Sequence, residues 1–202
     1  MSIVPEGARA STRGGLAPLG RWLHRAGVSA NAVTVVGLLL TLVAAWLVAT
    51  GQPAVAVAVL VLGALADTLD GQIAKAAGGG TTLGAFLDST FDRVSDAALA
   101  GAAVIYGALH ALPLLLWFAL IALISGSLVP YIRAKAESLG LSASVGLAPR
   151  EARMVLIVLG LAAWAVSADS QLLVMAFTAV ALLSTATVIQ RIAHVIGALR
   201  NT

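Results

Sequence analysis

Four aspartates lie within a stretch of the chain that is otherwise apolar enough to sit in a membrane. They are Asp67, Asp70, Asp88 and Asp92, and long uncharged runs precede and follow them. An aspartate near the centre of a membrane-spanning helix costs roughly 2.5 to 3.5 kcal/mol, so four cost on the order of 10 kcal/mol unless a cation offsets them. The stretch from Asp67 to Asp92 therefore predicts a functional site that binds metal.

The composition places the chain in a membrane. Of its 202 residues, 60% are hydrophobic and 10% are charged, whereas about a quarter of the residues in an ordinary soluble domain are charged. The apolar segments are long and uninterrupted, which favours helical spans over a membrane β-barrel. The chain has no cysteine, so disulfides and thiolate metal sites are excluded. The sequence predicts an all-α integral membrane protein.

The first 30 residues are expected to form a separate N-terminal region. Apolar residues from Leu16 onward recur at helical spacing among four arginines, Arg9, Arg13, Arg21 and Arg25. This pattern is typical of an amphipathic helix that lies in the headgroup plane next to the membrane. We expect residues 1–14 to be a basic tail. No compact apolar region ends in a small-residue cleavage site, so no removable signal peptide is expected.

Residues 31–202 are expected to form one domain of six membrane-spanning helices. Glycine, proline and polar turn residues separate the apolar segments, and Ser29 and Thr81 or Thr82 are suited to cap helices. The predicted spans cover residues 32–50, 53–77, 81 or 82–109, 113–137, 149–166 and 171–196.

All lysines and arginines fall at one end of these predicted spans. The opposite turns, near residues 51, 110 and 168, carry only His110 and Asp169. By the positive-inside rule, both termini and the aspartates face the cytoplasm. A pI near 10.0 could suggest nucleic acid. However, the basic residues are spread singly and form no basic helix face or reading motif, so no nucleic-acid partner is expected.

The aspartates lie at matching depths of a predicted helical hairpin. Counted from residue 79 in the turn, Asp70 is nine residues before and Asp88 nine after, while Asp67 and Asp92 are twelve before and thirteen after. An all-oxygen cluster selects hard cations, so we predict Mg²⁺ or Mn²⁺, as one ion or two, holding substrate phosphates. Alternatively, the acids are structural partners of basic residues or line an ion or proton path.

A known signature resembles this hairpin. The chain reads Asp67-x-x-Asp70-Gly71-x-x-Ala74-Lys75, then eight residues, then Gly84-x-x-x-Asp88-x-x-x-Asp92. This pattern is similar to that of the CDP-alcohol phosphatidyltransferase family, except that the family usually has arginine where this chain has Lys75. The resemblance implies a six-span enzyme that transfers a phosphatidyl group from CDP-diacylglycerol to an alcohol and releases CMP.

The same resemblance implies residue roles. Asp67, Asp70 and Asp88 would be metal ligands, and Asp92 a further ligand or the base that deprotonates the acceptor hydroxyl. The cytidine diphosphate site would be lined by Gly71, Ala74, Lys75 and Gly84. Two further residues, Asn31 and Thr34, resemble polar residues that the family keeps near the nucleotide, and helix capping is the alternative role for both.

The acceptor is indicated by a narrower resemblance. The bacterial phosphatidylinositol phosphate synthases, which use inositol 1-phosphate, are similar to this chain in the stretches GAFLDSTFDRVSD, YIRAKAESLG and GLAPREAR. In those enzymes basic residues hold the acceptor's phosphate, and the corresponding residues here are Arg133, Lys135, Arg153 and Arg191. The resemblance also implies a homodimer in the bacterial cytoplasmic membrane.

Alternatives stay open at this point. The four basic residues could be plain positive-inside charge, and glycerol 3-phosphate could be the acceptor. From another class, an ion or proton transporter could use the aspartates as a relay. Asp96 continues the face of Asp88 and Asp92 by one turn and is expected to pair with a neighbouring span or to support the site. The histidines, His24, His110 and His194, match no metal spacing and are expected to be interfacial or solvated.

Overall fold

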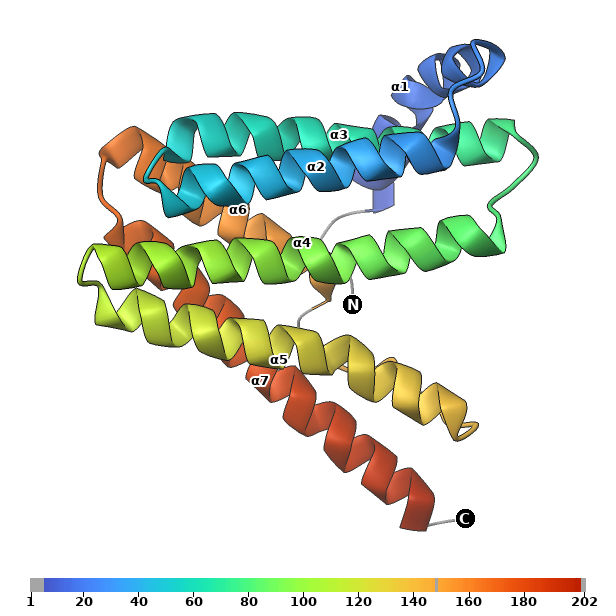
Figure 1. Cartoon of the computed structure of the whole chain (residues 1–202). Coiled ribbons are helices and arrows are strands. Elements are labelled where there is room, and N and C mark those ends of the chain that lie inside the picture. The colour runs from blue at the N-terminus through green and yellow to red at the C-terminus, as the bar shows by residue number, and fades with distance from the viewer. Residues whose placement is uncertain (1–5, 148, 201–202) are drawn as a thin grey trace. The chain divides into compact units, whose positions relative to one another are not determined.

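The computed structural model describes residues 6–147 and 149–200, with side chains from residue 16 onward. Within those residues every regular element is an α-helix, as predicted (Figure 1). The helices are α1 (Glu6–Arg25), α2 (Ala30–Ala49), α3 (Pro53–Ala76), α4 (Thr82–Leu109), α5 (Pro113–Ser138), α6 (Arg150–Ser167) and α7 (Gln171–Arg200). Helices α2 to α7 coincide with the six predicted spans to within four residues at each end.

The predicted helix boundaries have local causes. The Ser29 hydroxyl accepts a hydrogen bond from the Ala32 N–H at 3.2 Å, and the Thr81 hydroxyl accepts one from the Gly84 N–H at 3.0 Å. Both are N-caps that satisfy backbone donors of the first turn. After α3, Gly78 and Gly79 take φ values of +94° and +130°, which side chains rarely tolerate. These observations confirm the predicted caps and the predicted break.

The N-terminal helix is longer than predicted. Helix α1 begins at Glu6, so the prediction of a tail over residues 1–14 is wrong from Glu6 onward; residues 1–5 lie outside the described part. Glu6, Ala8, Arg9 and Ala10 are all good helix formers. Their helix propensity outweighs the helix-breaking tendency of Gly14 and Gly15, which follow them.

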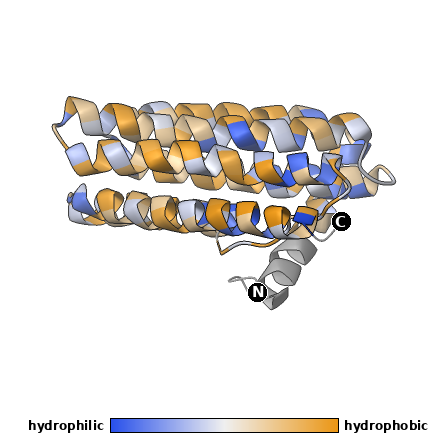
Figure 2. Cartoon of the chain, turned by 90° about the horizontal axis from the view of Figure 1, so that it is seen from below, coloured by the Kyte–Doolittle hydropathy of each residue, from blue (hydrophilic) through white to orange (hydrophobic). Residues whose placement is uncertain are grey.

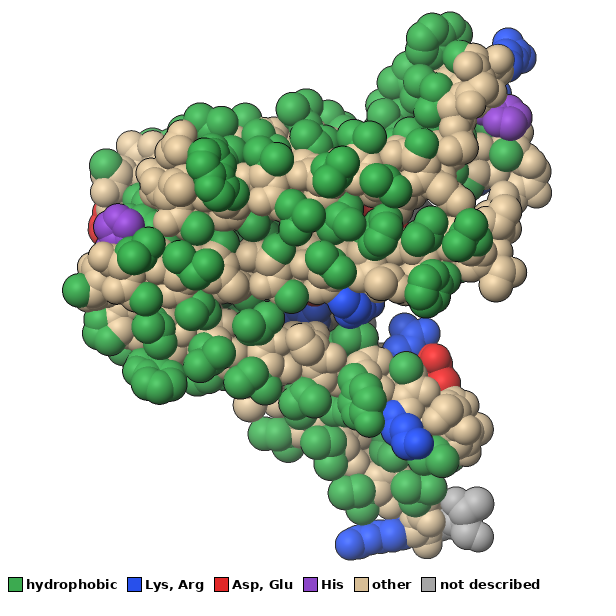
Figure 3. Space-filling model, in the orientation of Figure 1, with side chains coloured by type: hydrophobic (Ala, Val, Ile, Leu, Met, Phe, Trp, Pro, Cys, Tyr) green, Lys and Arg blue, Asp and Glu red, His purple; other side chains and the backbone are tan. Residues whose placement is uncertain are grey.

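Four of the described helices are long and apolar enough to cross a membrane, namely α2, α3, α5 and α7. Helices α4 and α6 carry charged residues in their first halves, so length and composition alone support a multi-pass membrane protein but not the count of six. Hydrophobic residues run along most of the helices (Figure 2), and hydrophobic side chains cover much of the visible surface (Figure 3). Large exposed side chains such as Trp46, Leu62 and Ile124 suit contact with lipid rather than with water.

The chain packs as two units. The first unit comprises Met1–Ala44 and Ala58–Ser95. In it, α2 and α3 run antiparallel and approach closely where both carry glycine (Figure 1). A Cβ added to Gly37 would lie 3.6 Å from the Cβ of Ala66, and one added to Gly63 would lie 3.6 Å from the Gly37 carbonyl oxygen. Small residues thus let the two helices pack backbone to backbone, as in many membrane proteins.

The second unit comprises Ala45–Val57 and Asp96–Thr202, and in it both α5 and α6 pack against α7. Its fully buried side chains include Leu115, Leu161, Leu173 and Phe177. Gly160 of α6 lies against Ala176 of α7, with no room for a Cβ at the glycine.

One face of α7 holds the loop between α5 and α6, which the structure describes over residues 139–147 and 149. The Thr187 hydroxyl accepts a hydrogen bond from the Leu147 N–H at 3.2 Å, Arg191 Nε donates to the Val145 carbonyl at 2.9 Å, and His194 Nε2 lies 3.1 Å from the Ser142 carbonyl. These three residues are spaced by four and three, so they share a helix face. The loop backbone that precedes α6 is therefore fixed by α7.

Candidate active site

Three of the four aspartates converge in the first unit. Asp67 of α3 and Asp88 and Asp92 of α4 each offer a carboxylate oxygen, and these oxygens all lie within 4.8 Å of one another. Like charges this close repel unless a cation lies among them. The donor set is all oxygen, with no nitrogen or sulfur, and so fits Mg²⁺ or Mn²⁺.

Asp70 stands apart from that group of three. Its side chain is buried, and the Thr34 hydroxyl, 2.6 Å from Asp70 Oδ2, donates a hydrogen bond to it. The same hydroxyl lies 3.0 Å from the Ala30 carbonyl, one turn back along α2. Thr34 is therefore not a helix cap, since Ser29 performs that role; it fixes the orientation of one predicted metal ligand.

A cavity of about 1000 Å³ opens beside these aspartates within the first unit. A Cβ added to Gly71 would meet nothing within 4 Å, so the space over that part of α3 is open. A Cβ added to Gly84 would lie 3.2 Å from both Asn31 Oδ1 and Thr81 Oγ1, so α4 needs glycine there to approach the start of α2. The cavity is lined by eight residues that the sequence predicted for the site: Asn31, Thr34, Asp67, Asp70, Gly71, Ala74, Gly84 and Asp88.

Two predicted residues lie elsewhere. Lys75 is exposed and is not among the residues that line the cavity. Asp92 belongs to the carboxylate group but is also absent from the cavity wall. His24 and Ser29, which the sequence did not predict for the site, do line the cavity. The only sequence signal for them is their closeness along the chain to Asn31.

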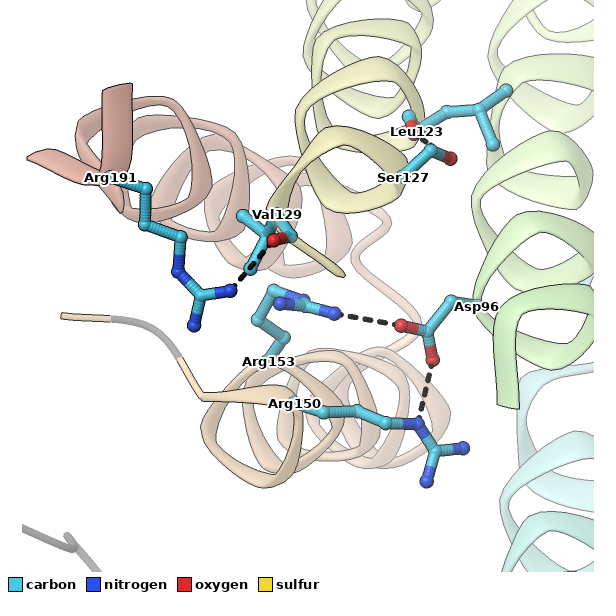
Figure 4. Close-up of polar contacts among 7 residues, drawn as sticks. All are labelled: Asp96, Leu123, Ser127, Val129, Arg150, Arg153 and Arg191. Carbon is cyan, nitrogen blue, oxygen red and sulfur yellow. Dashed lines mark hydrogen bonds and ion pairs between the residues drawn. The ribbon is translucent and has the colours of Figure 1, made fainter. Parts of the chain in front are cut away.

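The second unit contains a cluster of arginines (Figure 4). Arg153 is 4% exposed, and its Nη2 donates to Asp96 Oδ2 at 2.8 Å, while Arg150 Nε donates to Asp96 Oδ1 at 3.1 Å. Both arginines belong to the first turn of α6. The expected pairing of Asp96 with a neighbouring helix is confirmed, and its partners are two guanidinium groups rather than one.

Arg191 is held differently. It is 9% exposed, and its Nε and Nη1 donate to the carbonyls of Val145 and Val129 at 2.9 and 2.7 Å. These acceptors are neutral, so they orient the guanidinium without cancelling its charge. The charges of Arg133 and Arg153 act on Arg191, which places all three in one electrostatic cluster.

The remaining predicted basic residues lie on the surface of α5. Arg133 Nε pairs with Glu137 at 2.8 Å, and both side chains are more than half exposed. Lys135 is exposed as well. Of the four residues predicted to hold the acceptor's phosphate, the structure thus buries Arg153 and Arg191 and leaves Arg133 and Lys135 at the surface.

Comparisons with known proteins agree on one family. Residues 27–198 match the model of the CDP-alcohol phosphatidyltransferases. The chain is 35% identical over 162 residues to a phosphatidylinositol phosphate synthase of Mycobacterium marinum, covering 79% of this chain and 69% of that protein. It is 34% identical over 162 residues to the synthase of Mycobacterium tuberculosis, covering 79% and 75%.

Solved structures of the Mycobacterium tuberculosis enzyme are also similar. The crystal structure with CDP-DAG bound superposes with a TM-score of 0.82 at 31% identity, covering 89% of this chain and 92% of that one. The structure in complex with manganese and citrate gives the same TM-score and identity, covering 89% and 88%.

Proposed function

Because this chain belongs to the CDP-alcohol phosphatidyltransferase family, we propose that it transfers the phosphatidyl group of CDP-diacylglycerol to inositol 1-phosphate, giving phosphatidylinositol phosphate and CMP. The observation that carries the proposal is the group of three carboxylate oxygens within 4.8 Å of one another, in a unit that also holds a cavity of about 1000 Å³. The acceptor is supported by the likeness to the mycobacterial synthases.

The aspartates supply a divalent metal site. Asp67, Asp88 and Asp92, with Asp70 oriented by Thr34, would hold Mg²⁺ or Mn²⁺ as one or two ions. A metal bound there would neutralise the diphosphate and stabilise the leaving CMP. The manganese in the crystal structure of the Mycobacterium tuberculosis enzyme supports this metal class.

The chain's own residues then perform the transfer. Asp92 accepts the proton of the acceptor hydroxyl, and that oxygen forms a bond to the phosphatidyl phosphorus as the bond from phosphorus to CMP breaks. Gly71 and Ala74 leave room for the nucleotide, with Asn31 and Gly84 at the same cavity wall. Lys75, at the position where the family usually has arginine, would attract the diphosphate from outside the cavity wall.

The acceptor's phosphate requires positive charge. Arg153 and Arg191, helped by Arg133 and Lys135, would bind it, because charge-assisted hydrogen bonds to a phosphate are roughly twice as strong as neutral ones. The buried position of Arg153 and Arg191 favours a binding role over surface positive-inside charge.

The membrane arrangement follows the same proposal. Residues 1–30 would lie at the membrane surface and residues 31–202 would form the catalytic domain, with α2 to α7 all crossing the bilayer. Both termini and the aspartates would face the cytoplasm of a bacterial cell. The protein would act as a homodimer.

A CMP-release assay tests the proposal. Purified protein in detergent is given CDP-diacylglycerol with Mg²⁺ or Mn²⁺ and one of four acceptors: inositol 1-phosphate, glycerol 3-phosphate, inositol or serine. We expect release with inositol 1-phosphate and none after chelation of the metal. CMP release with glycerol 3-phosphate alone would show that glycerol 3-phosphate is the acceptor, and the proposed phosphatidyl transfer would stand. No release with any acceptor would overturn the enzyme assignment and favour a transporter.

A further inference from the structure

Asp96 is the carboxylate that faces two guanidinium groups at once. Its two oxygens are divided between them, with Oδ1 accepting from Arg150 at 3.1 Å and Oδ2 from Arg153 at 2.8 Å (Figure 4). The two arginines are three residues apart on α6 and so project from the same side of that helix. One carboxylate thus accepts hydrogen bonds from both guanidinium groups.

Burial makes this arrangement important for Arg153. The Arg153 side chain is 5% exposed, whereas those of Asp96 and Arg150 are 19% and 29% exposed. A buried guanidinium is destabilising unless acceptors take its hydrogen bonds. A free arginine side chain also loses rotamer entropy when it is ordered. The contact with Asp96 holds Arg153 in place before any ligand arrives, which removes part of the ordering cost of binding.

Positive charge also surrounds Arg191. The charges of Arg133 and Arg153 act on it, and its Nε and Nη1 donate to the neutral carbonyls of Val145 and Val129. These carbonyls orient the guanidinium without cancelling its charge. A region of this kind suits an anion such as the phosphate of a phosphate monoester.

We propose that Asp96 is a positioning residue for the acceptor's phosphate and that Arg150 is a further phosphate-binding residue beside Arg153. The inference rests on the proposed function, since it concerns how the acceptor of that reaction is bound. Asp96 touches no substrate in this scheme. It acts by orienting the two guanidinium groups, and Arg150, the more exposed of them, meets the phosphate from the solvent side.

Kinetics of Asp96→Asn test the positioning role. We expect the KM for inositol 1-phosphate to rise about tenfold, while the KM for CDP-diacylglycerol changes less than twofold. Asp96→Glu, which keeps the charge, should recover most of the loss. The matched control is Asp169→Asn, the same change at the turn before α7, where the carboxylate accepts a hydrogen bond from the Gln171 N–H at 2.9 Å. Both KM values should stay unchanged in this variant.

Double mutants separate positioning from general structural support. In an Arg153→Gln background, Asp96→Asn should change the KM for inositol 1-phosphate less than twofold further, because its effect is exerted through Arg153. Arg150→Gln alone should raise the same KM severalfold. A full additional tenfold effect of Asp96→Asn in the Arg153→Gln background, or equal changes in both substrates' KM values, would overturn the inference.

Direct binding distinguishes this inference from the proposed function. Calorimetry with inositol 1-phosphate and the wild-type protein, without CDP-diacylglycerol, should show binding that Asp96→Asn weakens about tenfold. If no acceptor supports CMP release, the proposed function fails, yet weakened binding would still support the phosphate site. If the wild type binds no inositol 1-phosphate, or if it uses glycerol 3-phosphate with a KM that Asp96→Asn leaves unchanged, the inference fails.

Discussion

Replacing Thr34 by valine isolates the hydrogen bond that orients Asp70. Valine keeps the volume and branching of threonine but removes the hydroxyl that donates to Asp70 Oδ2 at 2.6 Å. A hydrogen bond to a charged group contributes about 1.5 to 3 kcal/mol, which corresponds to about a 10- to 150-fold change in an equilibrium constant. A bound metal ion would itself orient Asp70, so we expect the lower end: about a tenfold rise in the Mn²⁺ concentration that gives half-maximal activity.

The measurement is CMP release as a function of Mn²⁺ concentration at saturating CDP-diacylglycerol. Thr34→Ser is the matched control, because serine keeps the donor, and it should stay within twofold of the wild type. A second readout needs no substrate: the Mn²⁺ concentration required to raise the thermal unfolding midpoint. This concentration should rise in the valine variant by about the same factor as the concentration for half-maximal activity. Identical Mn²⁺ dependence of the valine and serine variants would refute the reasoning, because the hydroxyl would then contribute nothing to the metal site.

Asp92→Asn should abolish turnover while the thermal midpoint without metal stays within a few degrees of the wild type; retained activity would remove Asp92 as the base. Gly71→Val should raise the KM for CDP-diacylglycerol at least tenfold by filling the open space over α3. Gly101 also has open space around it but lies outside that cavity, so Gly101→Val should leave this KM unchanged. Equal effects of the two substitutions would argue against nucleotide binding beside Gly71. Gly146→Ala should lower the thermal midpoint by several degrees, because φ is +141° and a Cβ would meet Thr187. Gly140→Ala, with φ of +74° but open space, should lower it less; the reverse order would contradict the importance of the Thr187 contact.

The sequence predicted the helices well because their ends are determined locally. Pro53 and Pro113 begin α3 and α5, and the glycines after Ala77 end α3, all within a few residues of the predicted limits. Helix α1 was predicted too short, because the glycine pair at 14 and 15 reads as a breaker although strong helix formers precede it.

The carboxylate hairpin was predictable only in part. The spacing brought Asp67, Asp88 and Asp92 together, but a separation of three residues turns a helix by about 300°, so Asp70 points about 60° away from Asp67. Its actual partner, Thr34, is 36 residues earlier on another helix. Similarly, the arginines that bind Asp96 follow it by 54 and 57 residues. Contacts at such separations depend on how helices rotate and pack, and one sequence does not determine that.

The contacts between α7 and the preceding loop imply an order of events during synthesis. The partners of Leu147, Val145 and Ser142 lie 40, 46 and 52 residues further along the chain. A ribosome must therefore complete most of α7 before this loop acquires its fixed backbone and before Arg191 reaches Val129. A nascent chain halted ahead of α7 would already contain every aspartate of the metal site, yet its loop would have none of these anchors. The unit with the aspartates thus needs no residue of α7, whereas the unit with the arginines is completed by the last helix to be made.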